Sequence, residues 1–153
     1  SVATQRVMMD GKDVTRAIRL PELTRNVVFI AREPRIRKEL VKKQRAMGLK
    51  AGAVMEGRDI ATVVFPKADY KLYFDANPRL RARRRLKELL KEGKKASFNQ
   101  VYKEILVRDA SDSQRKAGAL RVAEGAIVID TSPLTIDQTI DKILLILGDA
   151  HGV

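Results

Sequence analysis

Arginine and aspartate residues recur at helical spacing in the second half of the chain, where they could bind a phosphorylated ligand. Phe98, Val101 and Ile105 are three or four residues apart and share one helix face. The same spacing continues to three charged residues, Arg108, Asp112 and Arg115. If the helix persists, these charges lie on its inward side. Residues 109–113 are poor helix formers, so taken alone this segment favours a helix that ends near Asp109 and leaves the charges on the surface.

A second candidate site follows a short apolar run at 53–55, which we predict to be a buried strand. There Gly57 precedes Arg58 and Asp59. Ligands in open α/β sheets bind beyond the carboxyl ends of the strands, and glycine lets the backbone approach them closely. Arg58 offers a fork of donors and Asp59 an acceptor. A glycine turn with a surface ion pair explains the same residues equally well.

A third group is the basic run from Arg79 to Lys95, in which nine of seventeen residues are Lys or Arg. Arg81 and Arg85 are four residues apart and share a helix face. The run fits a solvated helix, an RNA-binding face or a lid that closes over phosphates, since the arginine fork chelates phosphate oxygens.

Arg37 is a fourth candidate, near the start of a helix predicted from Pro34 to Met47. We expect Ile36 and Leu40 to be buried, which places Arg37 at the edge of the apolar stripe, from where it could turn inward. Considered in isolation, a surface arginine is the better interpretation.

Strands alternate with helices along the chain, and this order predicts an α/β fold. Asp10-Gly11 indicates a hairpin, and apolar strands are expected at 70–74 and 126–129, the latter covered on both faces. Helix starts are predicted by caps at Asn77, Ser97 and Thr135, the last two in capping boxes with Gln100 and Gln138, and by prolines in the first turn. Gly48 and Gly93 predict helix ends. Besides 34–47, helices are expected over 21–32, from Pro78 to about Glu92, after Ser97, and after Thr135, the last with a buried stripe of Ile136, Ile140, Ile143, Leu144 and Leu147.

Composition narrows the classes of function. The 153 residues include 31 Lys and Arg against 19 Asp and Glu, a net charge of +12 that attracts polyanions. The absence of cysteine excludes disulfides, thiolate metal sites and cysteine nucleophiles. No apolar stretch is long enough to span a bilayer and no signal-peptide core is visible, so we expect a cytoplasmic protein without a membrane partner.

Taken together and in order, these segments resemble cytidylate kinases of the bacterial type. The run from Gly57 to Pro66 matches the family's central signature, and residues 81–85 are similar to its lid helix. Residues 108–115 look like its Arg-Asp-x-x-Asp-x-x-Arg element, and residues 126–132 resemble its last strand and turn. The resemblance runs from Val7 to about Leu147.

The resemblance implies a kinase that transfers the γ-phosphoryl of ATP, with Mg²⁺, to CMP or dCMP. Asp59 would accept from the cytosine amino group and Arg37 would donate to the base. Arg108 and Asp112 would hold the ribose hydroxyls. The phosphate groups would be held by arginines, with Arg58 and Arg115 on the monophosphate and Arg81 and Arg85 closing from the lid, so that Arg81, Arg85 and Arg115 act in catalysis by positioning and charge.

The resemblance also implies a layout. The fold would be a P-loop nucleoside-monophosphate-kinase-like parallel sheet with helices on both faces, here lacking the N-terminal P-loop strand and helix. Residues 1–52 would form the monophosphate-binding insertion, 53–77 the core strands, 78–118 the lid and following helix, and 119–153 the last core strand and helix. No metal ligand is assigned.

No G-x-x-x-x-G-K-[ST] run occurs in the sequence, so the ATP-contacting residues are unknown. The three predicted strands would flank the place of a central strand, so we expect a fragment, a complementary N-terminal segment or a sheet closed differently. The alternative function is an inactive kinase-derived module that binds RNA or a ribonucleoprotein through its basic surface.

Overall fold

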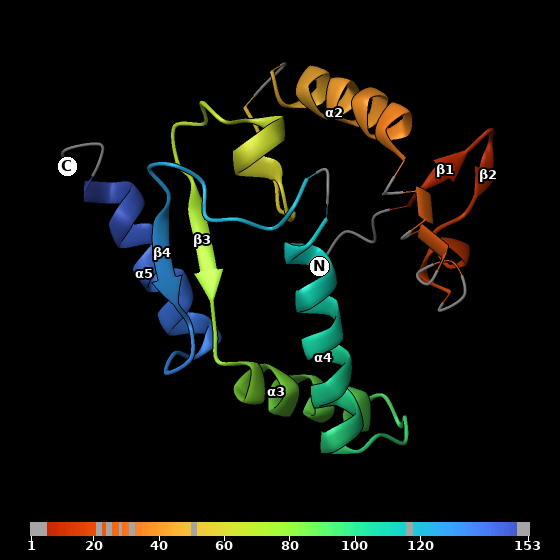
Figure 1. Ribbon diagram of the computed structural model, residues 1–153, viewed down its shortest axis with the longest axis vertical. Helices are drawn as coiled ribbons and strands as arrows, with labels where there is room; N and C mark the ends of the chain where they lie inside the picture. The colour runs from red at the N-terminus through yellow and green to blue at the C-terminus, as the bar shows by residue number, and fades with distance from the viewer. Residues whose placement is uncertain are drawn as a thin grey trace. The chain divides into compact units, whose positions relative to one another are not determined.

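The structure is a computed structural model that describes residues 6–20, 23, 26–27, 29–30, 33–49, 52–115 and 118–149. The chain divides into two units, residues 1–51 and 52–153. Figure 1 shows the elements of each unit, which are described separately below. The finer division into core, lid and insertion segments remains a prediction.

The first unit begins with the predicted hairpin. Strand β1 (Met8–Met9) pairs antiparallel with β2 (Lys12–Asp13). Asp10 and Gly11 both have positive φ, 50° and 75°, as a two-residue turn of type I′ requires. A 3₁₀ turn, η1 (Ala17–Arg19), follows. Of the helix expected over 21–32, residues 23, 26–27 and 29–30 are helical, and the remaining positions lie outside the described residues.

Helix α2 (Pro34–Gly48) confirms the prediction for this segment, with one correction. Glu33 caps it by accepting a hydrogen bond from the backbone N–H of Arg35 at 3.3 Å, and Pro34 occupies the first turn. The expected burial of Ile36 and Leu40 is wrong, because their exposed fractions are 40% and 48%. The helix is therefore specified locally, by its cap and its proline, rather than by a covered apolar face.

The second unit contains a parallel pair of strands, β3 (Leu72–Asp75) and β4 (Ile127–Asp130). They pair in register from Leu72 with Ile127 to Asp75 with Asp130, and Figure 1 shows them side by side. The strands expected at 70–74 and 126–129 thus hydrogen-bond directly and do not flank a gap. Ile129 is fully buried, whereas Val128 is 53% exposed, so coverage of both faces of the strand is not observed.

The strand expected at 53–55 is not formed. Residues 52–56 have no regular structure, and Val54 is fully exposed. A strand is stabilised by backbone hydrogen bonds to a neighbour. In the described part of the second unit, β3 and β4 pair with each other and neither pairs with residues 53–55, so the apolar run has no partner that would make it a strand.

Helices α3 (Pro78–Lys91) and α4 (Phe98–Ser113) pack against each other. Asn77 and Ser97 cap their first turns, and Gly93, with φ of 72°, ends the first. Ala82 is fully buried and Val101 is 2% exposed, so a small side chain lets the helices approach closely. Helix α4 continues four residues past Asp109, so the interpretation that it ends there is wrong.

Helix α5 (Ile136–Asp149) is the last described element. Thr135 and Gln138 form the predicted capping box, each side chain accepting from the other residue's backbone N–H, at 3.2 and 2.9 Å. The expected buried stripe is wrong, since Ile136 is 80% and Leu144 60% exposed. Ile143 and Leu147 of the expected stripe are half-buried. In the part of the chain that the structure describes, no helix combines the length and the apolar character needed to cross a membrane.

Candidate functional site

The buried carboxylate of Asp112, in the last turn of α4, is surrounded by three arginines. Its side chain is 2% exposed. Arg115, three residues on and 17% exposed, donates from Nη2 to Oδ1. Arg58 Nε lies 2.9 Å from Oδ2, and the Nε of Arg108, which is 72% exposed, lies 3.9 Å from the same oxygen. Burial of a carboxylate is costly unless cations surround it, and here the surrounding charge is positive.

The cluster keeps unused hydrogen-bonding capacity. Oδ2 of Asp112 is ion-paired with Arg58 and Arg108 but accepts no hydrogen bond from the described groups. Nε of Arg115 is likewise buried without an acceptor in the described chain. Buried polar atoms in native proteins usually have a partner. An acceptor and a donor that lack hydrogen-bond partners within one cluster of charges are therefore positions where a polar ligand could bind.

Arg58 and Asp59 are positioned by the segment that leads into a single π-helical turn, η2 (Ile60–Val64). The backbone carbonyl of Asp59 accepts from Val63 N at 2.8 Å and Val64 N at 3.3 Å. The buried side chain of Val64 anchors the turn. A Cβ at Gly57 would lie 2.8 Å from Cγ1 of Ile60, so glycine is needed for this close approach.

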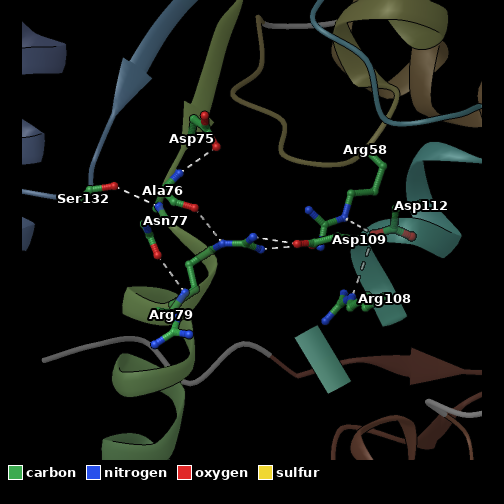
Figure 2. A network of polar contacts seen from close by, with 10 residues as sticks. Arg58, Asp75, Ala76, Asn77, Arg79, Arg108, Asp109, Asp112 and Ser132 are labelled. Atoms are coloured by element: carbon green, nitrogen blue, oxygen red, sulfur yellow. Dashed lines mark hydrogen bonds and ion pairs between the residues drawn. The ribbon is translucent and has the colours of Figure 1, made fainter. Parts of the chain in front are cut away.

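A second ion pair connects the two packed helices. Arg81 of α3 donates from Nη1 to Oδ1 of Asp109 at 3.0 Å and from Nη2 to Oδ2 at 2.6 Å, and its Nε donates to the carbonyl of Ala76 at 3.0 Å. This two-bond contact lowers the pKa of Asp109 and raises that of Arg81. The charges of Arg58 and Arg108 also lower the pKa of Asp109, so the two ion pairs, both drawn in Figure 2, form one electrostatic network.

The start of α3 is tied to the turn that follows β4. Asn77 N donates to Oγ of Ser132 at 2.9 Å, a contact visible in Figure 2. Arg84 Nη2 donates to the carbonyl of Thr131 at 2.6 Å, with the carbonyls of Ser132 and Leu134 at 3.3 and 3.2 Å. These contacts fix the base of the helix that carries Arg81. Arg85 instead lies on the surface and pairs with Glu88 at 3.0 Å.

The structure brings together four of the residues proposed from the sequence, Arg58, Arg108, Asp112 and Arg115. Arg81 joins the same network through Asp109. Arg37 belongs to the first unit, so its convergence with Asp59 remains a prediction. Asp109 and Arg84 were missed. The Arg-Asp element of the sequence includes Asp109, but only the packing of α3 on α4 selects its partner.

The space next to the cluster is small. A cavity of about 50 Å³ is lined by residues that include Gly57, Arg58, Tyr73 and Leu120. Pockets for drug-sized ligands are about 300–1,000 Å³, so this cavity holds one or two waters and does not enclose a nucleotide. Asp112 and its arginines can bind one side of such a ligand.

The described residues contain no group of three or more His, Asp or Glu side chains that could hold a metal ion. Mg²⁺ in phosphoryl-transfer enzymes is commonly held in part by substrate phosphates and keeps several waters. We therefore assign no described side chain to a metal.

The chain is similar to proteins of one known family. The family model for cytidylate kinase matches residues 1–148. The chain is 47% identical over 140 residues to the cytidylate kinase of Desulforamulus reducens, covering 92% of this chain and 63% of that protein. Identity to the cytidylate kinase of Bacillus subtilis is 43% over 140 residues, covering 92% and 62%. The chain thus spans somewhat less than two thirds of the length of these relatives.

Proposed function

Because the chain belongs to the cytidylate kinase family, we propose that it supplies the monophosphate site and lid of a kinase that transfers the γ-phosphoryl of ATP to CMP or dCMP. The family name of the relatives supports phosphoryl transfer to a cytidine nucleotide. The choice of CMP or dCMP, the use of ATP with Mg²⁺, and a cytoplasmic location are parts of this proposal.

The observation that carries the proposal is the buried Asp112 with its arginines. A carboxylate oxygen can accept a hydrogen bond from a hydroxyl, and Oδ2 of Asp112, which is ion-paired but accepts no hydrogen bond from the described groups, has that capacity. A ribose hydroxyl would satisfy it, while Arg108 flanks the same oxygen from the exposed side. The proposed ligand therefore explains why a charged group with spare hydrogen-bonding capacity is buried at the end of α4.

Arg58 and Arg115, the two arginines beside Asp112, would hold the monophosphate. Both already direct their guanidinium groups toward Asp112, and arginine forms paired hydrogen bonds with phosphate oxygens. The phosphoryl transferred from ATP would be met by Arg81 and Arg85 on α3. Charge spreads over its oxygens in the transition state, so fixed cations lower the barrier without an acid–base pair.

Asp59 and Arg37 would read the base. The backbone of Asp59 is fixed by two hydrogen bonds at the start of η2, and a carboxylate is the natural acceptor for the cytosine amino group. Arg37 lies on α2 in the first unit.

Calorimetry with CMP tests the proposal. The wild-type chain is expected to bind CMP, and Asp112→Asn is expected to weaken binding at least about tenfold because the buried charge that orients both phosphate arginines is lost. Asp141→Asn, an exposed change of equal charge on α5, serves as the matched control. If Asp112→Asn does not fold, Arg108→Gln gives the same test at an exposed position. No heat with CMP at millimolar concentration contradicts the proposal.

A second candidate, RNA binding, is favoured by one observation. The net charge is +12, and the exposed side of α3 carries Arg83, Lys87 and Lys91 around two leucines. Such a face attracts a phosphate backbone, and the affinity then falls steeply with salt. Fluorescence anisotropy with a single-stranded RNA at two salt concentrations measures this. Salt-sensitive RNA binding without any response to CMP would favour the second candidate.

A further inference from the structure

The guanidinium of Arg81 is engaged at each of its three nitrogens. Its two terminal nitrogens donate to the two oxygens of Asp109, at 3.0 and 2.6 Å, and Nε donates to the carbonyl of Ala76 at 3.0 Å. Two parallel bonds to a planar pair of oxygens are also the way in which arginine holds a phosphoryl group. Asp109 therefore occupies the edge of Arg81 that a phosphoryl group would use.

We propose that Asp109 is a competitor for Arg81, a carboxylate that occupies this arginine until a phosphoryl group displaces it. The inference rests on the proposed function, which assigns Arg81 to the transferred phosphoryl. Because Asp109 must be displaced, the binding of a phosphate in the ground state gains less free energy. An interaction that is weak in the ground state and stronger when charge develops on the transferring group raises the rate, whereas equally tight binding of both states does not.

The fold allows this exchange without separating the helices. Arg79 lies over the ring of Tyr102, with its guanidinium carbon 5.7 Å from the ring centroid, and the buried Ala82 and Val101 lie on the two packed helices. These contacts join α3 to α4 independently of Asp109. Arg81 and Asp109 are about one third exposed, so a ligand can reach them from solvent.

The position of Asp109 couples the exchange to the proposed nucleotide site. Asp109 lies one turn before Asp112 on α4, and the charges of Arg58 and Arg108 also lower its pKa. When Arg81 binds the phosphoryl group instead of Asp109, the positive charges of Arg58 and Arg108 would still offset part of the negative charge of Asp109. The carboxylate is then not left unpaired.

Calorimetry with CMP and with CDP, on the full chain, tests the proposal. CDP carries the second phosphoryl, which would contact Arg81. Asp109→Asn keeps the shape of the side chain and removes its charge. We expect CDP to bind about three- to tenfold more tightly in this variant, and CMP to change less than about twofold. The readout is the ratio of the two affinities, which a general loss of folding does not raise.

Two further variants separate the proposed competition from a general effect of charge. Arg81→Gln removes the guanidinium for which Asp109 and the phosphoryl group compete. Adding Asp109→Asn to this variant should therefore leave the ratio of the CDP affinity to the CMP affinity unchanged. Glu92→Gln removes an exposed carboxylate that pairs with Lys94 in the turn between the helices, and is expected to leave both affinities unchanged.

Two outcomes overturn the competition alone, and a third also overturns the proposed function. A CDP to CMP ratio that stays constant or falls in Asp109→Asn overturns the competition and leaves the proposed function intact. The same holds if the rise persists in the Arg81→Gln background, because it then reflects charge alone. A wild-type chain that binds neither nucleotide overturns the proposed function, and this inference with it.

Discussion

Arg115 donates a hydrogen bond to Asp112 three residues before it, and both side chains are withdrawn from solvent at the carboxyl end of α4. The pair lies where the helix gives way to irregular chain, so its geometry depends on the last turn of α4 being formed. Asp112 in turn is approached by Arg58 from a segment more than 50 residues earlier. The candidate site is thus assembled from one helix end and one distant loop.

The first prediction concerns the fork of Arg115. Arg115→Lys keeps the positive charge but replaces the planar group by a single ammonium, which cannot serve Asp112 and a phosphate together. CMP affinity measured by calorimetry is expected to fall at least about tenfold. Arg83→Lys, an exposed change of the same chemistry on α3, is the control. Equal affinities for CMP in both variants would contradict the assignment of Arg115 to the phosphate.

The second prediction is a dependence of stability on pH. The pKa of Asp109 is lowered in the folded chain because Arg81 hydrogen-bonds its carboxylate. The unfolded chain therefore binds more protons in the acid range, and the contribution of the pair is complete above the ordinary pKa of about 3.9. It is lost as the pH falls through the lowered pKa of the folded chain.

Denaturation in urea at a series of pH values checks this. The loss of stability below about pH 4 should be smaller in Asp109→Asn than in the wild type, because the amide has no proton to gain. Asp130 also has a lowered pKa, through its hydrogen bonds with Ser132. Asp130→Asn is therefore measured alongside, since it removes a separate part of the acid dependence. If the free energy of unfolding fell equally steeply with decreasing pH in the wild type and in Asp109→Asn, the result would argue against the ion pair.

The third prediction tests the packing of α3 on α4. Ala82 has no exposed surface, so extra atoms there would force the helices apart. Ala82→Leu is expected to lower the free energy of unfolding by about 1–3 kcal/mol. Thermal melting followed by circular dichroism measures the loss. Arg83→Leu, at the exposed neighbouring position, should change the melting temperature little, and a stable Ala82→Leu would indicate that the helices are not in close contact.

The fourth prediction concerns the anchor of α3. Arg84 donates to carbonyls of the turn after β4, the nearest at 2.6 Å. Arg84→Met retains most of the side-chain length but has no donor. Because these bonds are exposed, we expect a modest loss of about 1 kcal/mol in the free energy of unfolding. Arg83→Met is the matched variant on the same turn of the helix, and an equal loss in both would show that Arg84 is not an anchor.

The sequence alone determined the local features. Asp10-Gly11 specifies the hairpin because both residues tolerate positive φ, and the caps at Asn77, Ser97 and Thr135 specify helix starts because their side chains accept from nearby backbone groups. The order of the charged motifs was also sufficient to identify the family. Each of these signals acts within a few residues, or depends only on the order of residues along the chain.

Only the tertiary structure decided burial and pairing. The carboxylates of Asp109 and Asp112 lie one turn apart on α4, yet one receives Arg81 from α3 and the other Arg58 from a distant loop. Residues 53–55 have the composition of a strand and remain irregular, and Ile136 and Leu144 have the spacing of a buried stripe and remain exposed. The reason is physical: a strand or an apolar face is stabilised by what lies against it, and that neighbour is not encoded in the segment itself.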